Sequence, residues 1–448
     1  MTMAYIIALN PNLLTGFDTG SPLWNAVFCA TLISTAAGSF CMAFLANKPF
    51  VMSSGMGLNS FFATIVTQIV AVTGATYTQG FQAAMIIILL EGILFLILSA
   101  FNVREKIVGA IPLSIRTGIS PAIGMMLLNI GFGSNAGIYS ETGGPFYMMS
   151  DFFGALTAGS AKASMGSGWG AMVITIITVF VGLIAIVVLD HRKFKGAVLV
   201  GMLTASVFYW ICDFVFLGEN PFASLAGASW LPPLGDMVET TLFKFDFKTL
   251  SSLGLTSVLT LIITFCVIDM FDTIGTLVGT ASRVGMVDAD GSMPNMKEAL
   301  VSDAVGTIIG GITGTSTVTT FVESASGVEA GGRTGLTALV SGILFLLCLF
   351  IAPIAAVIPA AATSSALIYV GVLMISGLRN LDFDDRLSIV PVLLMLIAMP
   401  VSGSIGHAIG IAMITYCIIH VFTGKAKEIS VLSWIISAIF IIKFFIAI

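Results

Sequence analysis

Long apolar runs, each bounded by charged residues, glycine or proline, recur along the whole chain. A helix of about 20 apolar residues crosses a hydrocarbon layer of about 30 Å, so these runs predict membrane-spanning segments. Fourteen segments are predicted, the first of them incomplete: 1–14, 24–46, 53–72, 79–101, 118–132, 170–189, 196–217, 253–282, 300–313, 314–327, 335–358, 360–377, 388–401 and 406–423. A further apolar run, 429–448, carries Lys443 and either crosses the membrane or lies along its surface.

The composition supports an all-α integral membrane protein. Of the 448 residues 57% are hydrophobic and only 9% are charged, and the mean hydropathy is +1.06. Soluble domains carry about 25% charged residues, so a large soluble helical core is excluded. The net charge of −5 comes without a basic surface, so no nucleic acid is expected as a partner. The six cysteines stand singly and show no metal-binding spacing, so we expect no metal and no bound cofactor.

Basic residues set the predicted orientation. With the N-terminus in the cytoplasm and fourteen spans, fourteen Lys and Arg residues fall inside and three, Lys162, Lys244 and Lys248, fall outside. This bias follows the positive-inside rule. Two longer external loops, 133–169 and 218–252, complete the arrangement. The sequence therefore predicts a multi-pass protein of the cell membrane, in a bacterium the inner membrane.

Two of the predicted segments differ from ordinary spans. Segment 53–72 opens SSGMGLNSFF, with Gly57 just before Asn59, and segment 314–327 reads GTSTVTTFVESASG, with five hydroxyls before Glu323. Glycine and β-branched residues weaken a helix, and unwound backbone at membrane depth persists only where it lines a cavity or is buried in protein. The segments are the third of each half of seven, so they predict a binding site between two inverted repeats.

Four acidic residues are predicted to lie inside the membrane: Glu91, Asp269, Asp272 and Glu323. A carboxylate there costs at least about 2.5 kcal/mol and therefore usually faces a functional cavity. Asp269 and Asp272 are three residues apart, which places them on one helix face, where their repulsion favours a proton on one of them. Glu91 is interpreted as a structural or secondary site, and Gly92 beside it as a position in an ordinary span that tolerates substitution better than Gly57.

Enzymatic alternatives find little support. An intramembrane aspartyl protease would need its two aspartates on different helices and a GxGD context, which the sequence lacks.

An anion carrier is disfavoured because no Arg or Lys accompanies the acidic candidate site. An ion channel is less favoured than alternating access, because two broken helices at matching places are typical of a transporter.

Four strings carry a family resemblance that runs from residue 1 to about residue 425: TMAYIIALNPN, SSGMGLNSFFA, FCVIDMFDTIGTLVGTASRVG and GTSTVTTFVESASGVEAGGRTGLTALV. With them the chain resembles the AzgA-like purine permeases, the guanine/hypoxanthine branch of the nucleobase–ascorbate transporter superfamily. The resemblance implies fourteen segments in two inverted repeats, with a core domain of 1–101 and 253–358 and a gate domain of 118–217 and 360–423.

The resemblance also implies uptake of purine bases (guanine, hypoxanthine or adenine) with protons as the coupling ion. By motif match Asn59, Asp269 and Glu323 contact the base, and Asp272, with Asp269, couples transport to protons. The same fold with another cargo, such as xanthine, urate or uracil, is the alternative. The expected partners are the purine and the lipid bilayer, with a homodimer as an open option.

Three further side chains or backbone positions are predicted at the substrate. Gly57 would let the backbone unwind beside Asn59. Thr320 is one of the hydroxyls of the second broken segment. Phe271, like Phe61 or Phe321, could stack on the ring.

Overall fold

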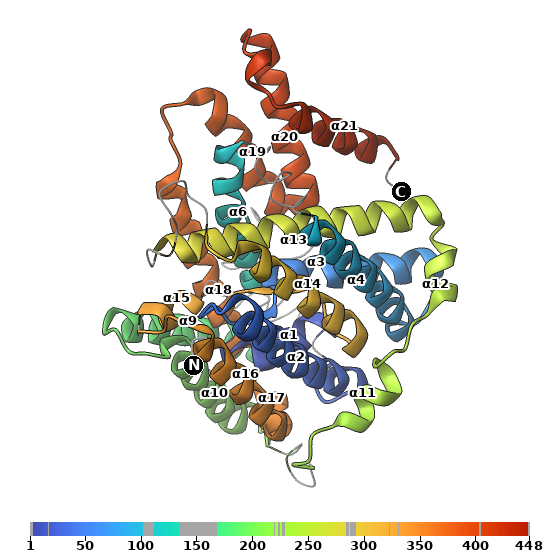
Figure 1. The fold of residues 1–448 in the computed structure, drawn as a ribbon. Helices are drawn as coiled ribbons and strands as arrows, with labels where there is room; N and C mark the ends of the chain where they lie inside the picture. Colours follow the sequence, from blue (N-terminus) through green and yellow to red (C-terminus); the bar gives the residue numbers. More distant parts are fainter. Residues whose placement is uncertain are drawn as a thin grey trace.

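The computed structural model describes residues 3–16, 18–101, 112–133, 168–218, 220–222, 225, 229–283, 286, 293–321, 323–329, 331–402 and 405–446. This part of the chain is almost entirely helical (Figure 1). The helices of the first half are α1 (Ile6–Leu14), α2 (Pro22–Cys41), α3 (Met56–Thr73), α4 (Tyr77–Ala100), α6 (Leu113–Phe132), α9 (Gly168–His191) and α10 (Ala197–Cys212).

The second half repeats this order after two short helices in the connection, α11 (Leu234–Thr240) and α12 (Phe247–Ser252). Its helices are α13 (Leu255–Arg283), α14 (Met296–Thr313), α15 (Ser324–Glu329), α16 (Gly335–Leu347), α17 (Ala352–Val357), α18 (Ala360–Ile375), α19 (Arg386–Ser402), α20 (Ile405–Phe422) and α21 (Val431–Ile446). The long helix α13 runs across the middle of the molecule in Figure 1.

Each predicted segment coincides with a helix, or with a strand and helix, of the structure, and α21 coincides with the extra C-terminal run. Seven helical stretches in the described part meet the length and hydropathy of a membrane span: Pro22–Ala46, Tyr77–Ala100, Leu113–Phe132, Trp169–His191, Ala197–Leu217, Gly335–Val357 and Ala360–Asn380. The all-helical membrane fold is thus confirmed, and the total of fourteen crossings stays a prediction. Most of the predicted loop 133–169 lies outside the described residues.

The two predicted broken segments pair with each other. Strand β1 (Met52–Ser54) and strand β2 (Val318–Thr320) form a two-stranded antiparallel sheet, with Ser53 opposite Thr319. The pairing continues beyond the strands, where Gly55 N donates to Thr317 O at 3.1 Å. Antiparallel pairing is what an inverted repeat produces, because matching segments run in opposite directions. The pairing also gives the extended backbone N–H and C=O groups hydrogen-bond partners, which lipid could not supply.

Glycines bring backbones together at two helix crossings. At the crossing of α4 and α14, a Cβ on Gly92 would lie 2.9 Å from Ile308 N, and one on Gly311 would lie 2.9 Å from Leu89 N. At the crossing of α6 and α18, Gly124 and Gly371 meet in the same reciprocal way. Small residues at such crossings are how membrane helices pack closely. A branched residue at Gly92 would therefore disturb the packing of α4 on α14, and its effect relative to one at Gly57 stays a prediction.

These crossings belong to two sets of packed helices. Helix α14 packs against α4 and α2, and α2 packs against α16, whereas α6 packs against α18 and α19, and α18 packs against α9 and α10. The division into a core and a gate domain stays a prediction.

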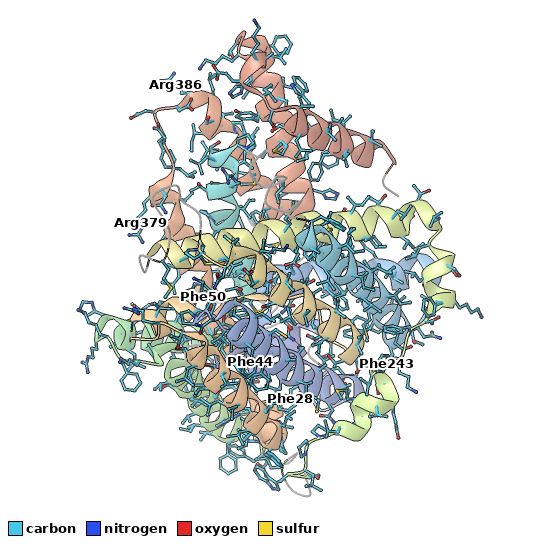
Figure 2. All side chains as sticks on the ribbon, viewed as in Figure 1. Phe28, Phe44, Phe50, Phe243, Arg379 and Arg386 are labelled. Carbon is cyan, nitrogen blue, oxygen red and sulfur yellow. The ribbon has the colours of Figure 1, made fainter. Side chains whose placement is uncertain are left out.

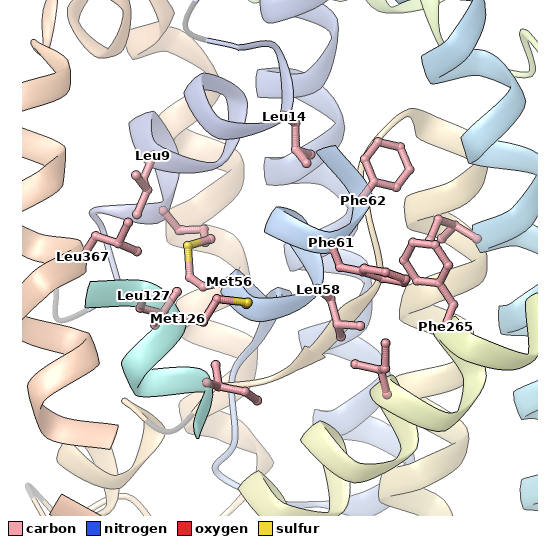
Figure 3. Packing of buried hydrophobic residues seen from close by; sticks show 14 of the residues in the cluster. Leu9, Leu14, Met56, Leu58, Phe61, Phe62, Met126, Leu127, Phe265 and Leu367 are labelled. Carbon is pink, nitrogen blue, oxygen red and sulfur yellow. The ribbon is translucent and has the colours of Figure 1, made fainter. Parts of the chain in front are cut away.

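Apolar side chains fill the interior and also cover much of the outside. In the interior, Phe61 packs on Phe265 with ring centroids 4.7 Å apart (Figure 3). On the outside, Phe44 is 73% exposed and Phe243 65% exposed (Figure 2). An apolar exterior of this kind is unfavourable in water and matches a protein surrounded by lipid.

Candidate substrate-binding site

A cavity lies where the two broken segments meet. Its polar wall comes from α1, α13 and the strand pair, and its apolar wall comes from α6 and α18. The lining residues are Tyr5, Gly55, Met56, Asp272, Thr276, Thr319, Thr320, Phe321 and Glu323 on the first side and Ile123, Leu127, Val370 and Met374 on the second. Figure 3 shows Met56 beside Leu127 at the boundary between the two walls. Polar groups and aliphatic side chains thus face each other across one cavity.

Glu323 is held by a residue that sequence reasoning missed. The Tyr5 hydroxyl donates to Glu323 Oε1 at 2.6 Å, across 318 positions of sequence. Tyr5 is only 1% exposed and immediately precedes α1, whereas Glu323 immediately precedes α15. The available signal was the single phenol in the family string TMAYIIALNPN.

Thr320 reaches the cavity as predicted. Its Oγ1 is buried and has no hydrogen-bond partner among the described residues. A buried hydroxyl without a partner is costly, and a ligand that bonds to it would remove that cost.

Gly55 brings the backbone of the first broken segment against the second. A Cβ at this position would lie 2.8 Å from Thr319 Cγ2 and 3.3 Å from Asp272 Oδ2. The sequence pattern singled out Gly57 in this stretch. Gly57 lies in the first turn of α3, and its surroundings, like the side chain of Phe271, fall outside the described detail.

Gly55→Ala is expected to weaken ligand binding about tenfold, since overpacking costs typically about 1–3 kcal/mol and 1.4 kcal/mol is a factor of ten. The Gly55 backbone is extended (φ −66°, ψ 123°), so alanine adds crowding without backbone strain. Thermal-shift titration with guanine or hypoxanthine measures the loss, because a bound ligand raises the stability of the folded state. Gly235→Ala in α11 is the matched control, since a Cβ there meets nothing within 4 Å. A full ligand-induced shift in Gly55→Ala would remove this segment from the site.

Behind the polar wall, two buried aspartates share one hydroxyl. Thr273 Oγ1 lies 3.1 Å from Asp269 Oδ1, 3.0 Å from Asp303 Oδ2 and 2.8 Å from Thr319 Oγ1. Asp269, Thr273 and Asp303 are all 0% exposed. A threonine hydroxyl carries one proton and cannot donate to both carboxylates. Two carboxylates held around one hydroxyl repel each other, and a proton shared by the pair relieves that repulsion.

Asp303 is a buried acidic residue that the four predicted candidates did not include. It lies within α14, about one helical turn after the start of the apolar run 300–313, and is fully buried. The signal was present, because Asp303 is the only acidic residue within that predicted span.

Asn59 also lies behind the wall. Its Nδ2 donates to Asn10 Oδ1, and its Oδ1 accepts a short hydrogen bond from Ser316. Asn10 in turn donates to Thr315 at 3.0 Å. This network ties α1, α3 and the approach to β2 together. Asn59 therefore shapes the cavity from behind.

Glu91 lies among groups that hold the strand pair in place. It lies in α4, is 0% exposed, and accepts a hydrogen bond from Thr317 Oγ1 at 3.2 Å. Thr317 is the residue whose carbonyl accepts from Gly55. Glu91 thus supports the strand pair from the side away from the cavity.

The structure sorts the candidates into two groups. Asp272, Thr320 and Glu323 line the cavity, whereas Asn59 and Asp269 lie in the polar networks behind it. Of the aromatic candidates, Phe321 lines the cavity and Phe61 packs on Phe265.

Comparison with known proteins agrees with this architecture. A family model described as "Permease family" (Xan_ur_permease) matches residues 1–407. The adenine permease AdeP of Escherichia coli is 35% identical over 99% of this chain and 90% of its own length. The guanine/hypoxanthine permease PbuO of Bacillus subtilis is 33% identical over 99% of this chain and 94% of its own length.

Among solved structures, the transmembrane domain of the cyanobacterial bicarbonate transporter BicA superposes with a TM-score of 0.63. That alignment covers 92% of this chain and 94% of that transmembrane domain at 16% identity, which shows a shared fold. The family resemblance seen in the sequence is confirmed by the family match and the two relatives. The chain belongs to this permease family and is a membrane transporter, not an enzyme.

Proposed function

We propose that the protein takes up purine bases together with protons by alternating access. The observation that carries the proposal is the cavity at the junction of the two broken segments, with carboxylates on one wall and aliphatic side chains on the other. The relatives AdeP and PbuO, named for adenine and for guanine/hypoxanthine, support purines as the cargo class.

The two walls match the two kinds of surface that a purine presents. The ring edge carries N–H donors, which Glu323 and Asp272 accept in charge-assisted hydrogen bonds. Thr320 adds a hydroxyl to the same wall. The ring faces are apolar and lie against Leu127 and Val370 of α6 and α18. Water-sized solutes would leave the apolar wall unused, which disfavours an ion channel.

In this proposal Asp272 contacts the base, and Asp269 shares the transported proton with Asp303. That division reverses the one implied by the family resemblance. It rests on geometry: Asp272 lines the cavity, whereas Asp269 contacts Thr273, which also contacts Asp303. Thr319 connects the two sites, since it lines the cavity and its Oγ1 bonds to Thr273.

Alternating access would come from movement between the two walls. The polar wall belongs to α1, α13 and the strand pair, and the apolar wall to α6 and α18, which matches the proposed core and gate domains. Sliding of one set past the other exposes the cavity on each side in turn. We place the protein in the cell membrane with its N-terminus in the cytoplasm.

A competition uptake assay tests the proposal. In cells without purine uptake of their own, guanine and hypoxanthine are expected to inhibit labelled purine uptake more strongly than xanthine, urate or uracil. A protonophore should abolish accumulation and leave exchange of labelled for unlabelled base intact. Inhibition by uracil alone would overturn the cargo class. Accumulation unaffected by the protonophore would overturn proton coupling.

A further inference from the structure

The hydrogen bond between Tyr5 and Glu323 also bears on the charge of the Glu323 carboxyl group. At 2.6 Å the O···O distance lies in the range of a hydroxyl bonded to an ionised carboxylate, about 2.5–2.7 Å, and is shorter than the usual value of about 2.7–2.8 Å between neutral groups. A hydrogen bond donated to a carboxylate favours its charged form. Tyr5 therefore supports an ionised Glu323 at the cavity wall.

Two other charged side chains among the described residues line a cavity together with Glu323, and neither takes over the role of Tyr5 in supporting the ionised form of its carboxyl group. Asp272 lines the same cavity and, when ionised, opposes a second negative charge. Lys195 lines a second cavity to which Glu323 also contributes, but its side chain is exposed to solvent. The buried phenol is thus a donor that the structure places directly on the carboxylate.

The charge state of Glu323 decides which purine edge it recognises. Hypoxanthine and guanine carry a 6-oxo group and present N1–H, a donor that an ionised carboxylate accepts. Adenine presents N1 as an acceptor beside its 6-amino group, so an ionised carboxylate opposes N1 with a lone pair. A protonated carboxyl group, which both donates and accepts, would suit adenine instead. The two edges therefore call for opposite states of the same side chain.

We propose that Tyr5 is a specificity-determining residue that holds Glu323 in the ionised, acceptor-only form and so makes the site select 6-oxopurines over 6-aminopurines. The inference rests on the proposed function and names the substrate class within it. Tyr5 acts through Glu323, as a positioning residue. Overall sequence identity does not indicate whether this chain prefers 6-oxopurines or 6-aminopurines. The adenine permease AdeP and the guanine/hypoxanthine permease PbuO are 35% and 33% identical to it.

Tyr5→Phe tests the proposal because it removes only the hydroxyl. With the full chain in lipid nanodiscs, the Kd values for hypoxanthine and adenine are measured by calorimetry. The wild type is expected to bind hypoxanthine at least about tenfold more tightly than adenine. In Tyr5→Phe the hypoxanthine Kd should rise about tenfold while the adenine Kd stays or falls, so the ratio of the two drops by about tenfold.

Tyr77→Phe is the matched control. The Tyr77 hydroxyl also bonds to α1, donating to Leu14 O at 2.8 Å, but Tyr77 does not line the cavity. Its removal should leave the ratio unchanged. In a Glu323→Gln background, Tyr5→Phe should change the ratio less than twofold, because the hydroxyl then has no carboxylate to act on.

Three outcomes would overturn the inference. Equal loss of both bases in Tyr5→Phe would make Tyr5 a structural support only. A similar change of ratio in Tyr77→Phe would trace the effect to α1 as a whole. A wild type that binds adenine as tightly as hypoxanthine would contradict the proposal even without a folded variant. Failure of the proposed function is distinct from all of these, since the wild type would then bind neither base.

Discussion

Glu323→Gln is expected to abolish guanine uptake while the protein remains in the membrane. The amide keeps the size of the side chain but replaces one acceptor oxygen with a donor, which then faces the N–H groups of the base. Hydrogen bonds to a charged group contribute about 1.5–3 kcal/mol each, so losing the pair weakens binding by more than about a hundredfold. Labelled guanine uptake, normalised to the amount of protein in the membrane, measures the effect.

Glu239→Gln is the control for this experiment. Glu239 lies in α11, is exposed, and is far from the cavity lining. It should transport like the wild type. If Glu323→Gln transports at the wild-type rate, Glu323 does not contact the base, and the proposed site is wrong.

Asp303→Asn is expected to separate binding from coupling. The cavity wall is unchanged, so the base should still bind, but the site that Asp303 and Asp269 form for a proton is lost. A potential of 100 mV is worth about 2.3 kcal/mol per charge, or an accumulation ratio of about fifty for one proton per base. In Asp303→Asn this ratio should fall to about one, measured as internal against external base at steady state.

Two comparisons make this result specific. Glu298→Gln, an exposed acidic residue in the first turn of the same helix, should accumulate base normally. Asp272→Asn should instead lose binding. If Asp272→Asn binds normally and loses accumulation while Asp303→Asn does the reverse, the two sites exchange roles.

Much of the architecture could be predicted from the sequence because lipid imposes simple rules. Length and hydropathy located the helices, and the glycines and hydroxyls around Asn59 and Thr320 located the two broken segments. These signals are local in sequence. The pairing of the two broken segments as strands was not predicted, since no local pattern fixes a register such as Ser53 opposite Thr319.

The parts that were missed depend on contacts between distant segments. Asp303 was left out of the predicted site although it stands within the predicted span 300–313, because its contact with Thr273 of α13 is set by the fold. Tyr5 gives no hydropathy signal that distinguishes it from a lipid-facing aromatic residue. In both cases the deciding partner lies on another segment of the chain.

The strand pair also constrains how the protein is made. About 260 residues separate β1 from β2, so at 5–20 residues per second the ribosome needs about 13–50 s to deliver the second strand after the first. Throughout that interval the polar backbone around Ser53 has no β2 to bond with, at a depth where each unsatisfied group costs several kcal/mol. The nascent first half must therefore keep this stretch hydrated or sheltered by the insertion machinery. The binding site is consequently among the last features to form, and a chain released before Thr320 would be a ready substrate for membrane proteases.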